Sequence, residues 1–142
     1  MSSFDELFPA ELVNAKKEKV TRDTLHGKKV GVYFSAHWCP PCRGFTPTLV
    51  EFYEELKSQG KDFEIVFVSS DRSEQDMFGY MTEANMPWLA VPYGDEHVAK
   101  LKQKYGISGI PTLVILNQDG EIITKDGRGQ VATKGPRAFE SW

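Results

Sequence analysis

Two short runs of β-forming residues constrain the fold of this chain more than any other feature. Val30–Ser35 and Phe63–Ser69 are largely apolar, as strands buried on both faces of a sheet are. The segment between them repeats apolar residues on one helical face, at Phe45, Leu49, Phe52 and Leu56. Because a buried strand, a helix and a second buried strand follow one another, the sequence predicts an α/β layered domain.

The rest of the chain continues this alternation. We expect a helix or arm over residues 1–18, then a strand over Val20–Leu25. Helices follow over Ser73–Ala84 and Asp95–Tyr105, with a short strand, Trp88–Val91, between them. Two strands joined by Asn117–Gly120 form a hairpin, Thr112–Leu116 and Glu121–Thr124. The tail, Lys134–Trp142, is expected as a last helix or an irregular strap. These elements predict one domain over residues 1–142, with a central mixed β-sheet flanked by helices.

Local signals mark where the helices begin, bend and end. Ser73 is a candidate N-cap, because its hydroxyl can accept a hydrogen bond from the first turn. Gly60 is a plausible end for the long central helix. Pro47 lies inside that helix and is expected to kink it, since proline has no N–H to donate.

Composition limits the class of protein. The chain has 142 residues, 40% of them hydrophobic and 26% charged, a balance typical of one globular domain. The net charge of −3, spread over both signs, argues against a nucleic-acid partner. We find no apolar run long enough to span a membrane and no secretory signal at the N-terminus. We therefore expect a monomer that contacts no membrane. Its expected location is the cytoplasm, and a second pool in the nucleus is compatible with the sequence.

The chemistry of the chain centres on its two cysteines. They lie three positions apart in Trp38-Cys39-Pro40-Pro41-Cys42-Arg43, where a buried strand gives way to a helix. The helix dipole and the neighbouring Arg43 favour a thiolate at Cys39, the form that attacks disulfides. Cys42 lies one turn further on, within reach of a mixed disulfide at Cys39. Pro40 and Pro41 fit the first turn of a helix and restrict the loop between the sulfurs.

Other roles for two cysteines fit less well. A structural disulfide across so short a loop stabilises by only about 2 kcal/mol in the chain-entropy model. A zinc site needs four ligands, and the chain adds only His26, His37 and His97 to the cysteines. A zinc site whose ligands come from two chains remains an alternative. Covalent attachment of a c-type haem is excluded, because it requires a histidine at the position of Arg43. We therefore expect no metal and no cofactor.

A second motif, Gly109-Ile110-Pro111-Thr112, leads into the predicted strand at Thr112. A trans proline opening a strand is the ordinary arrangement, since only about 5–6% of X–Pro bonds are cis. The residues alone leave both isomers open.

With both motifs in view, the chain resembles the thioredoxin superfamily, and within it the tryparedoxin and nucleoredoxin branch. The resemblance rests on residues 33–47, 66–71, 86–93 and 105–113, and so spans nearly the whole chain. It implies a thioredoxin fold, an attacking Cys39, a resolving Cys42 and a cis Ile110–Pro111 bond beside them. It also implies that Trp38 borders the site and that a client pairs as a short strand with the backbone near Pro111.

Three departures from thioredoxins and tryparedoxins matter for the chemistry. Pro40-Pro41 replaces the Gly-Pro of thioredoxins proper, and Ser70 stands where tryparedoxins commonly have Trp. Tyr33 stands where thioredoxins have a buried Asp. A phenol stays protonated near neutral pH, so Tyr33 is expected to act only as a hydrogen-bond partner. The proton of Cys42 then has two candidate routes, solvent or Asp71.

The resemblance implies a protein-disulfide reductase. Oxidised proteins are its expected substrates, with peroxiredoxin-type peroxidases among the clients. A low-molecular-weight dithiol or a flavin reductase is its expected electron donor. A different class of function also fits: a redox-sensitive binding module that docks a partner beside Pro111 and releases it when Cys39 is oxidised.

Overall fold

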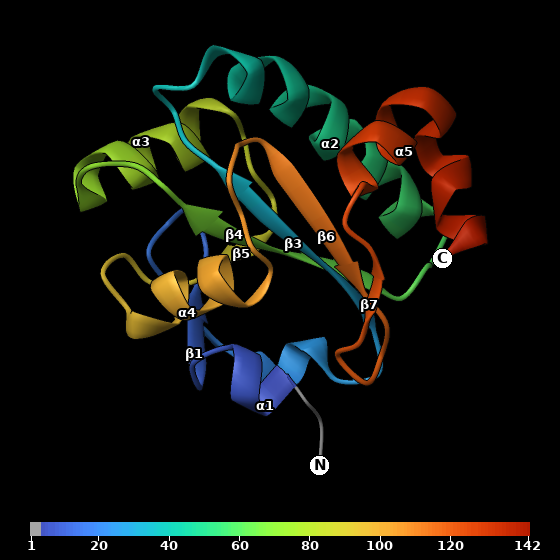
Figure 1. Cartoon of the computed structure of the whole chain (residues 1–142), viewed down its shortest axis with the longest axis horizontal. Coiled ribbons are helices and arrows are strands. Elements are labelled where there is room, and N and C mark those ends of the chain that lie inside the picture. The colour runs from blue at the N-terminus through green and yellow to red at the C-terminus, as the bar shows by residue number, and fades with distance from the viewer. Residues whose placement is uncertain (1–3) are drawn as a thin grey trace.

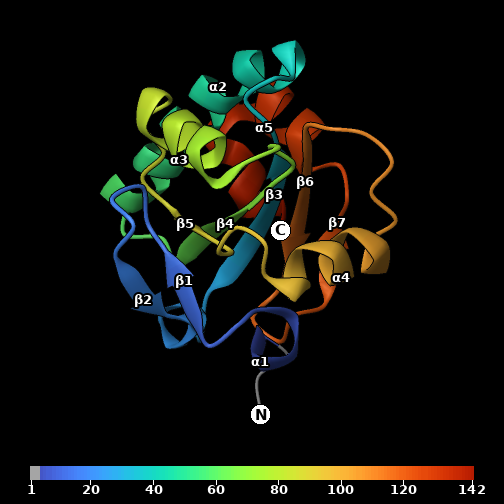
Figure 2. The ribbon, with the colours of Figure 1, turned by 90° about the vertical axis from the view of Figure 1, so that its left-hand side faces the viewer.

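The computed structural model describes residues 4–142 of the chain. Its strands form one seven-stranded mixed sheet in the order β2-β1-β5-β4-β3-β6-β7 (Figures 1 and 2). The strands are β1 (Glu11–Val13), β2 (Lys19–Thr21), β3 (Lys29–Ser35), β4 (Phe63–Ser69), β5 (Leu89–Ala90), β6 (Thr112–Leu116) and β7 (Ile122–Thr124). β3 pairs in parallel with β4 and antiparallel with β6, and therefore lies inside the sheet.

Helices cover both faces of this sheet. The helices are α1 (Phe4–Leu7), α2 (Pro40–Ser58), α3 (Glu74–Glu83), α4 (Glu96–Lys104) and α5 (Gly127–Lys134), with two 3-10 helices, η1 (Arg22–Leu25) and η2 (Gly135–Ser141). Figure 1 shows α2, α3 and α5 above the sheet and α1 and α4 below it. The fold is therefore the mixed α/β arrangement that the sequence predicts.

Two buried clusters hold these layers together. One contains the inward side chains of α2, α3, α5 and η2, among them Leu49, Met77 and Val131. The other joins α1, η1 and α4 to the opposite face, through Phe4, Leu25 and Leu101. Strands β3 and β4 contribute to both clusters, which explains why these two strands are apolar on both sides.

Several predicted boundaries are confirmed closely. Ser73 caps α3, since its Oγ accepts a hydrogen bond from the N–H of Asp76 at 3.0 Å. The helix predicted over Asp95–Tyr105 is α4 with those two residues as its caps. α2 ends at Ser58, and Gly60 follows with a φ of +73°, a conformation that glycine adopts at little cost. Pro47 lies within α2, and its predicted kink stays a prediction.

Other predicted elements need correction. Residues 1–18 are not one helix or arm: the described part contains α1 and the strand β1, which pairs with β2 and β5. The strand predicted over Val20–Leu25 ends at Thr21, because the Thr21 hydroxyl accepts from the N–H of Asp23 and starts η1. Of Trp88–Val91 only Leu89–Ala90 is strand, and the second hairpin strand begins at Ile122.

The C-terminal part agrees with the prediction only at its end. A last helix is present within Lys134–Trp142, as the 3-10 helix η2 over Gly135–Ser141. The helix α5 before it was not predicted. It begins against β6, where a Cβ added to Gly127 would lie 2.8 Å from the carbonyl oxygen of Leu113. Packing on the sheet, which the local sequence does not reveal, holds this glycine-rich helix in place.

Candidate functional site

The two cysteines lie where β3 gives way to α2, as predicted. Cys39 is the N-cap residue of α2, and Pro40 and Pro41 begin the helix. Both cysteines carry free thiols. Both cysteines are buried, but Cys39 keeps 5% of its surface exposed and Cys42 keeps none. This inequality is the geometric basis for assigning the two sulfurs different roles.

The second motif of the sequence lies directly beside Cys39. Its Sγ is 3.8 Å from the carbonyl oxygen of Ile110, and the Ile110–Pro111 bond is cis, as the resemblance implies. Ile110 packs against the small cluster formed by Ala36 and the two cysteines. Segments 39–42 and 110–111, far apart in the sequence, therefore form one site.

A cavity of about 370 Å³ extends from this point along the backbone of residues 105–112. Lys125 and Arg128 line it as well, and its lining contains no carboxylate. The Nζ of Lys125 donates to the carbonyl oxygen of Tyr105 at 3.1 Å. An extended peptide or a small anionic thiol fits such a shallow, cationic surface by shape and by charge.

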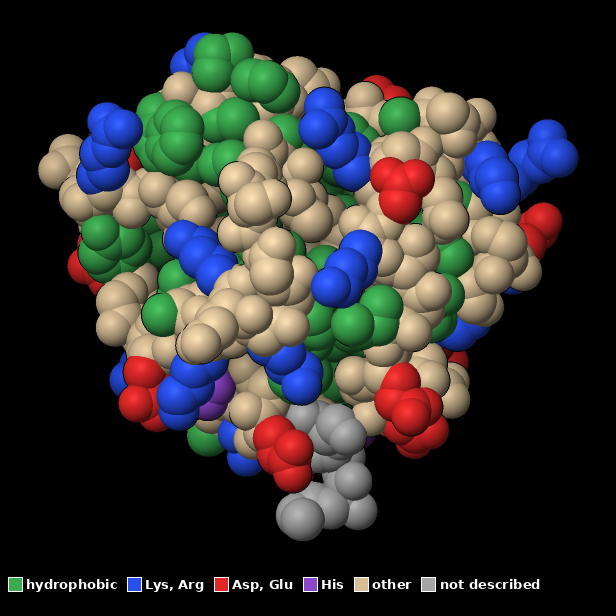
Figure 3. Space-filling view, viewed as in Figure 1, with side chains coloured by type: hydrophobic (Ala, Val, Ile, Leu, Met, Phe, Trp, Pro, Cys, Tyr) green, Lys and Arg blue, Asp and Glu red, His purple; other side chains and the backbone are tan. Residues whose placement is uncertain are grey.

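Trp38 forms an exposed surface at the edge of the site. Its side chain is 48% exposed, and its Nε1 donates to the carbonyl oxygen of Ser70 at 3.0 Å. The guanidinium of Arg72 lies 5.2 Å from the ring centroid. Figure 3 shows hydrophobic side chains gathered over the loop that enters α2, with Lys and Arg side chains nearby. The exposed Pro40 and Pro41 follow closely in the chain. Trp38 and the two prolines make the surface beside Cys39 apolar, and Arg72 gives it positive charge.

Arg43 lies on the outer side of α2. Its backbone N–H donates to the carbonyl oxygen of Cys39 at 3.1 Å, and its side chain is exposed. Within residues 4–142, no carboxylate lies within ion-pair distance of its guanidinium. The Arg43 guanidinium therefore has no ion-pair partner among these residues, and it lines a separate cavity together with His37 and Glu83.

A compact group of hydroxyls lies behind Cys42. The Thr46 Oγ1 is 2.7 Å from the Tyr33 hydroxyl and 2.6 Å from the Tyr80 hydroxyl. The Tyr80 hydroxyl is in turn 2.7 Å from the Ser35 Oγ. These four residues come from β3, α2 and α3 and are buried. We call them the hydroxyl cluster. Sequence reasoning found Tyr33 and missed the other three, since no motif links residues so far apart in the chain.

Burial raises the pKa of Cys42 to about 11, and the adjacent Cys39 thiol adds to this effect. A hydrogen bond from Ser35 acts in the opposite direction. Burial also raises the pKa of Tyr33, reinforced by Tyr80. Near neutral pH, Cys42 is thus a thiol and Tyr33 a neutral phenol, which fits the role expected of Tyr33.

Asp71, one of the two candidate proton routes, has both carboxylate oxygens engaged. Oδ1 accepts from the backbone N–H of His37 at 2.8 Å, and Oδ2 accepts from the hydroxyl of Ser69 at 2.7 Å. Asp71 thus anchors the loop before Trp38 to the end of β4. His37 is half-buried and stacks on Tyr80 with ring centroids 5.0 Å apart. Its Nε2 is 3.2 Å from a carboxylate oxygen of Glu83.

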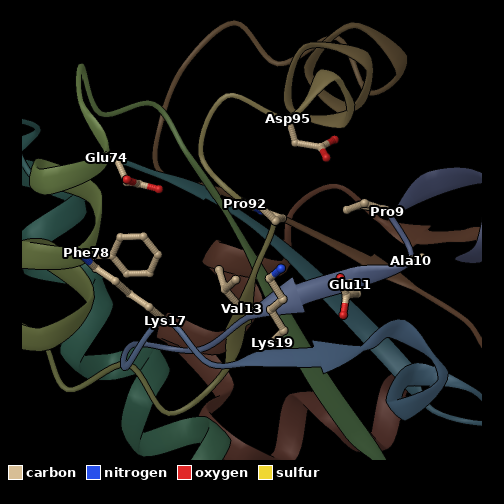
Figure 4. A pocket seen from close by; sticks show the side chains of 10 residues that line it. All are labelled: Pro9, Ala10, Glu11, Val13, Lys17, Lys19, Glu74, Phe78, Pro92 and Asp95. Carbon is tan, nitrogen blue, oxygen red and sulfur yellow. The ribbon is translucent and has the colours of Figure 1, made fainter.

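Trp88 is a core residue, as expected: it is 1% exposed and packs edge-on against Tyr33 and Tyr53. A further cavity, of about 540 Å³, lies over β1 and the start of α3 (Figure 4). Its lining combines acidic and basic side chains, among them Glu74 and Lys19, and includes no cysteine or histidine. The redox chemistry therefore belongs to the cysteine site and not to this cavity.

Two further properties concern the described residues 4–142. None of their helices is long and apolar enough to cross a membrane. No group of three or more His, Cys, Asp or Glu side chains among them could hold a metal ion.

Known proteins resemble this chain over most of its length. A family model described as thioredoxin-like matches residues 27–122. Nucleoredoxin of Mus musculus is 50% identical over 129 residues, which is 90% of this chain and 29% of the nucleoredoxin. This chain thus spans less than a third of the nucleoredoxin that it matches.

Solved structures of tryparedoxins share the fold. Tryparedoxin from Trypanosoma brucei superposes with a TM-score of 0.86 at 41% identity, covering 96% of this chain and 94% of the other. Tryparedoxin II complexed with glutathionylspermidine has a TM-score of 0.86 at 36% identity, covering 96% and 95%. The central mixed sheet, the CxxC pair and these similarities agree: the chain belongs to the thioredoxin-like family of oxidoreductases.

Proposed function

We propose that this protein reduces disulfide bonds in other proteins, with Cys39 as the attacking sulfur and Cys42 as the resolving one. The observation that carries the proposal is the unequal exposure of the two sulfurs at the start of α2. Cys39 lies at the N-terminal end of α2, where the helix dipole attracts negative charge, and burial raises the pKa of Cys42 to about 11.

The reaction takes place in two exchange steps. The Cys39 thiolate attacks a client disulfide, forms a mixed disulfide and releases one client sulfur as a thiolate, which takes up a proton. Cys42 then loses its proton and attacks the Sγ of Cys39. The second client sulfur leaves, and a Cys39–Cys42 disulfide remains. An external dithiol or a flavin reductase must return two electrons to close the cycle.

The surface around Cys39 supports a polypeptide client. The carbonyl oxygen of Ile110 lies beside the attacking sulfur, and the adjacent cavity runs along the backbone of residues 105–112, where an extended segment of a client can pair. Trp38, Pro40 and Pro41 offer apolar contact area next to it. Oxidised proteins, including peroxiredoxin-type peroxidases, are the clients that we propose.

Lys125 and Arg128 place positive charge on the cavity that runs along the backbone of residues 105–112. This charge suits the carboxylates of a glutathione-type thiol. A tryparedoxin II of the same fold has been solved with glutathionylspermidine. A low-molecular-weight thiol of this class is therefore our first proposal for the electron donor.

Trapping tests the order of the two cysteines. Cys42→Ser keeps the attacking sulfur and removes the resolving one, so it should accumulate mixed disulfides with clients at Cys39. The measurement is mass spectrometry of the linked peptides after incubation with oxidised protein. Cys39→Ser is the matched control and should trap nothing. Linkage through Cys42 in the control, at a yield equal to that of Cys42→Ser, would reverse the assigned roles.

A further inference from the structure

Arg72 carries a positive charge beside the site that the two-cysteine reaction does not use. Its guanidinium carbon lies 5.2 Å from the centroid of the Trp38 ring, and Trp38 precedes Cys39 in the chain. The Arg72 side chain is exposed, and no carboxylate within residues 4–142 lies at ion-pair distance from it. A cation held over an aromatic face without an ion-pair partner is available to an anionic ligand.

The two chain segments that carry this pair are bound firmly to each other. The indole N–H of Trp38 donates to the carbonyl oxygen of Ser70 at 3.0 Å. The backbone N–H of His37 donates to Oδ1 of Asp71 at 2.8 Å, and the backbone N–H of Ser70 donates to the carbonyl oxygen of Ser35 at 2.9 Å. The tryptophan ring and the backbone that carries the arginine are therefore fixed relative to each other.

The carboxylate nearest in sequence, Asp71, does not offset the charge of Arg72. Asp71 is 7% exposed, and its two oxygens accept hydrogen bonds from the His37 backbone N–H and the Ser69 hydroxyl. The next residue, Arg72, is exposed. The charge that this loop presents to an approaching molecule is therefore positive.

Positive charge thus lies at two places near Cys39, although the chain as a whole has a net charge of −3. One place is the Trp38–Arg72 pair. The other is the cavity along residues 105–112, which Lys125 and Arg128 line without any carboxylate. A partner that docks on this surface meets a cationic field, which favours acidic groups around its disulfide.

We propose that Arg72, held over the Trp38 ring, selects protein clients that carry acidic residues next to the disulfide cysteine. The guanidinium pairs with a client carboxylate, which its planar donors match in geometry, while the client cysteine lies at Cys39. Trp38 is the positioning residue for the guanidinium. This inference deepens the proposed function and rests on it.

A protein segment fits this place better than a small thiol does. The cavity that suits a glutathione-type thiol is lined by residues 105–112, Lys125 and Arg128, and neither Trp38 nor Arg72 belongs to it. The Trp38–Arg72 pair lies on an exposed surface. An extended chain that crosses this surface can contact the arginine and still present its sulfur to Cys39.

Synthetic peptides that differ only in charge test the proposal. Each peptide carries one cysteine as a mixed disulfide with 2-thiopyridine, flanked on one side by two Asp, two Asn or two Lys residues, and both orders are made. Attack of the Cys39 thiolate on the peptide sulfur releases pyridine-2-thione, an uncharged leaving group whose absorbance gives the rate. The readout is the ratio of the second-order rate constants for the Asp and Asn peptides. This ratio cancels any effect of a variant on the Cys39 thiolate itself.

Wild type should favour the Asp peptide about two- to fivefold at low salt, the range of an exposed ion pair. The preference should shrink at about 1 M salt, where charges are screened within about 3 Å. Arg72→Gln should at least halve the ratio, and Arg72→Glu should favour the Lys peptide instead. Arg137→Gln is the matched control, because it removes the same charge from an exposed residue of η2. This control should keep the wild-type ratio.

The proposal is overturned if wild type shows no preference, if Arg72→Gln keeps more than half of the wild-type ratio, or if Arg137→Gln loses as much. Reduction of the oxidised protein by glutathione provides a further arm. If Arg72→Gln slows that reaction as much as it slows attack on the Asp peptide, the arginine serves a small thiol and the proposal also fails. The Asn peptide separates this test from the proposed function. A wild type that reacts with no peptide refutes the attack by Cys39, whereas equal reaction with all peptides refutes only the role of Arg72.

Discussion

Tyr33 shows how a single residue changes the chemistry of the site. Its hydroxyl is 2.7 Å from the Thr46 Oγ1, and burial raises its pKa well above the ordinary value of a phenol. It therefore stays neutral across the working range of pH. A buried carboxylate at this place would act as a base, whereas Tyr33 is a neutral hydrogen-bond partner of Thr46.

This role predicts the behaviour of Tyr33→Phe. The pH profile of disulfide reduction below pH 8 should move by less than about half a unit, because the change removes no charge. The free energy of unfolding should fall by about 1 kcal/mol, since Thr46 loses one hydrogen-bond partner. Steady-state rates from pH 5 to 8 and urea unfolding measure the two effects. A shift of the profile by a full unit would show that Tyr33 tunes the reacting sulfurs directly.

Cys42 predicts a pH dependence of stability. Its pKa is raised from 9.0 to about 11 in the folded protein, so the folded state binds more protons than the unfolded state between these values. Its stabilising contribution is full below pH 9 and is lost as pH rises toward 11. Reduced wild type should lose on the order of 1–2 kcal/mol more than Cys42→Ser between pH 8 and pH 10.

Urea unfolding of both reduced proteins at the two pH values provides this measurement. Cys39 is common to both proteins, and Tyr33 has not yet ionised in the folded state at pH 10. The difference between the proteins therefore isolates Cys42. Equal losses in the two proteins would contradict the raised pKa of the buried thiol.

At the scale of elements, two glycines form a matched pair of predictions. Gly127 begins α5, and a Cβ there would lie 2.8 Å from the Leu113 carbonyl oxygen. Gly127→Ala should therefore destabilise the protein by about 1–3 kcal/mol. Gly79 lies exposed within α3 with no atom within 4 Å of an added Cβ. Gly79→Ala should stabilise by about 0.5–1 kcal/mol, because alanine favours a helix.

Thermal unfolding of the two variants checks both signs. If Gly127→Ala were as stable as wild type, α5 would not pack on β6 as closely as the structure places it. If Gly79→Ala lost stability, a steric clash of the added methyl group would outweigh the gain in helix propensity at that position of α3.

The same helices show which parts of the fold the sequence could predict. α2, α3 and α4 carry their own signals, in apolar spacing and in caps such as Ser73 and Asp95. α5 has two glycines and little amphipathic character, and its position depends on close contact with β6. β1 is three residues long, too short for a periodic pattern. Elements held by distant contacts were therefore missed.

The candidate site divides in the same way. Cys39, Cys42 and Pro111 stand in local motifs, and the family resemblance was enough to bring them together. Ser35, Thr46 and Tyr80 meet behind Cys42 only because β3, α2 and α3 pack against one another. A single sequence holds no signal for such a meeting.

At the scale of the whole molecule, the sheet order predicts one cooperative unit. β3 and β4 contribute side chains to both buried clusters, so neither face can lose its packing alone. Trp142 packs against Phe52 and Phe63 on the same core. We predict that residues 1–142 unfold in a single transition.

Three tryptophans make this prediction measurable. In Trp38→Phe combined with Trp142→Phe, fluorescence reports on the core residue Trp88 alone, while circular dichroism reports on all helices. Urea midpoints from the two signals should coincide. Separate transitions would mean that part of the sheet, such as the β1–β2 edge, unfolds on its own.

The central claim is that Cys39 and Cys42 catalyse repeated disulfide exchange. Reduction of insulin by dithiothreitol, followed by turbidity at neutral pH, tests it most directly. Wild type should accelerate the reaction over many equivalents, and Cys39→Ser should remain at the uncatalysed rate, because a serine hydroxyl cannot exchange with a disulfide. Wild type at the background rate, or Cys39→Ser with more than a few per cent of wild-type activity, would contradict the account.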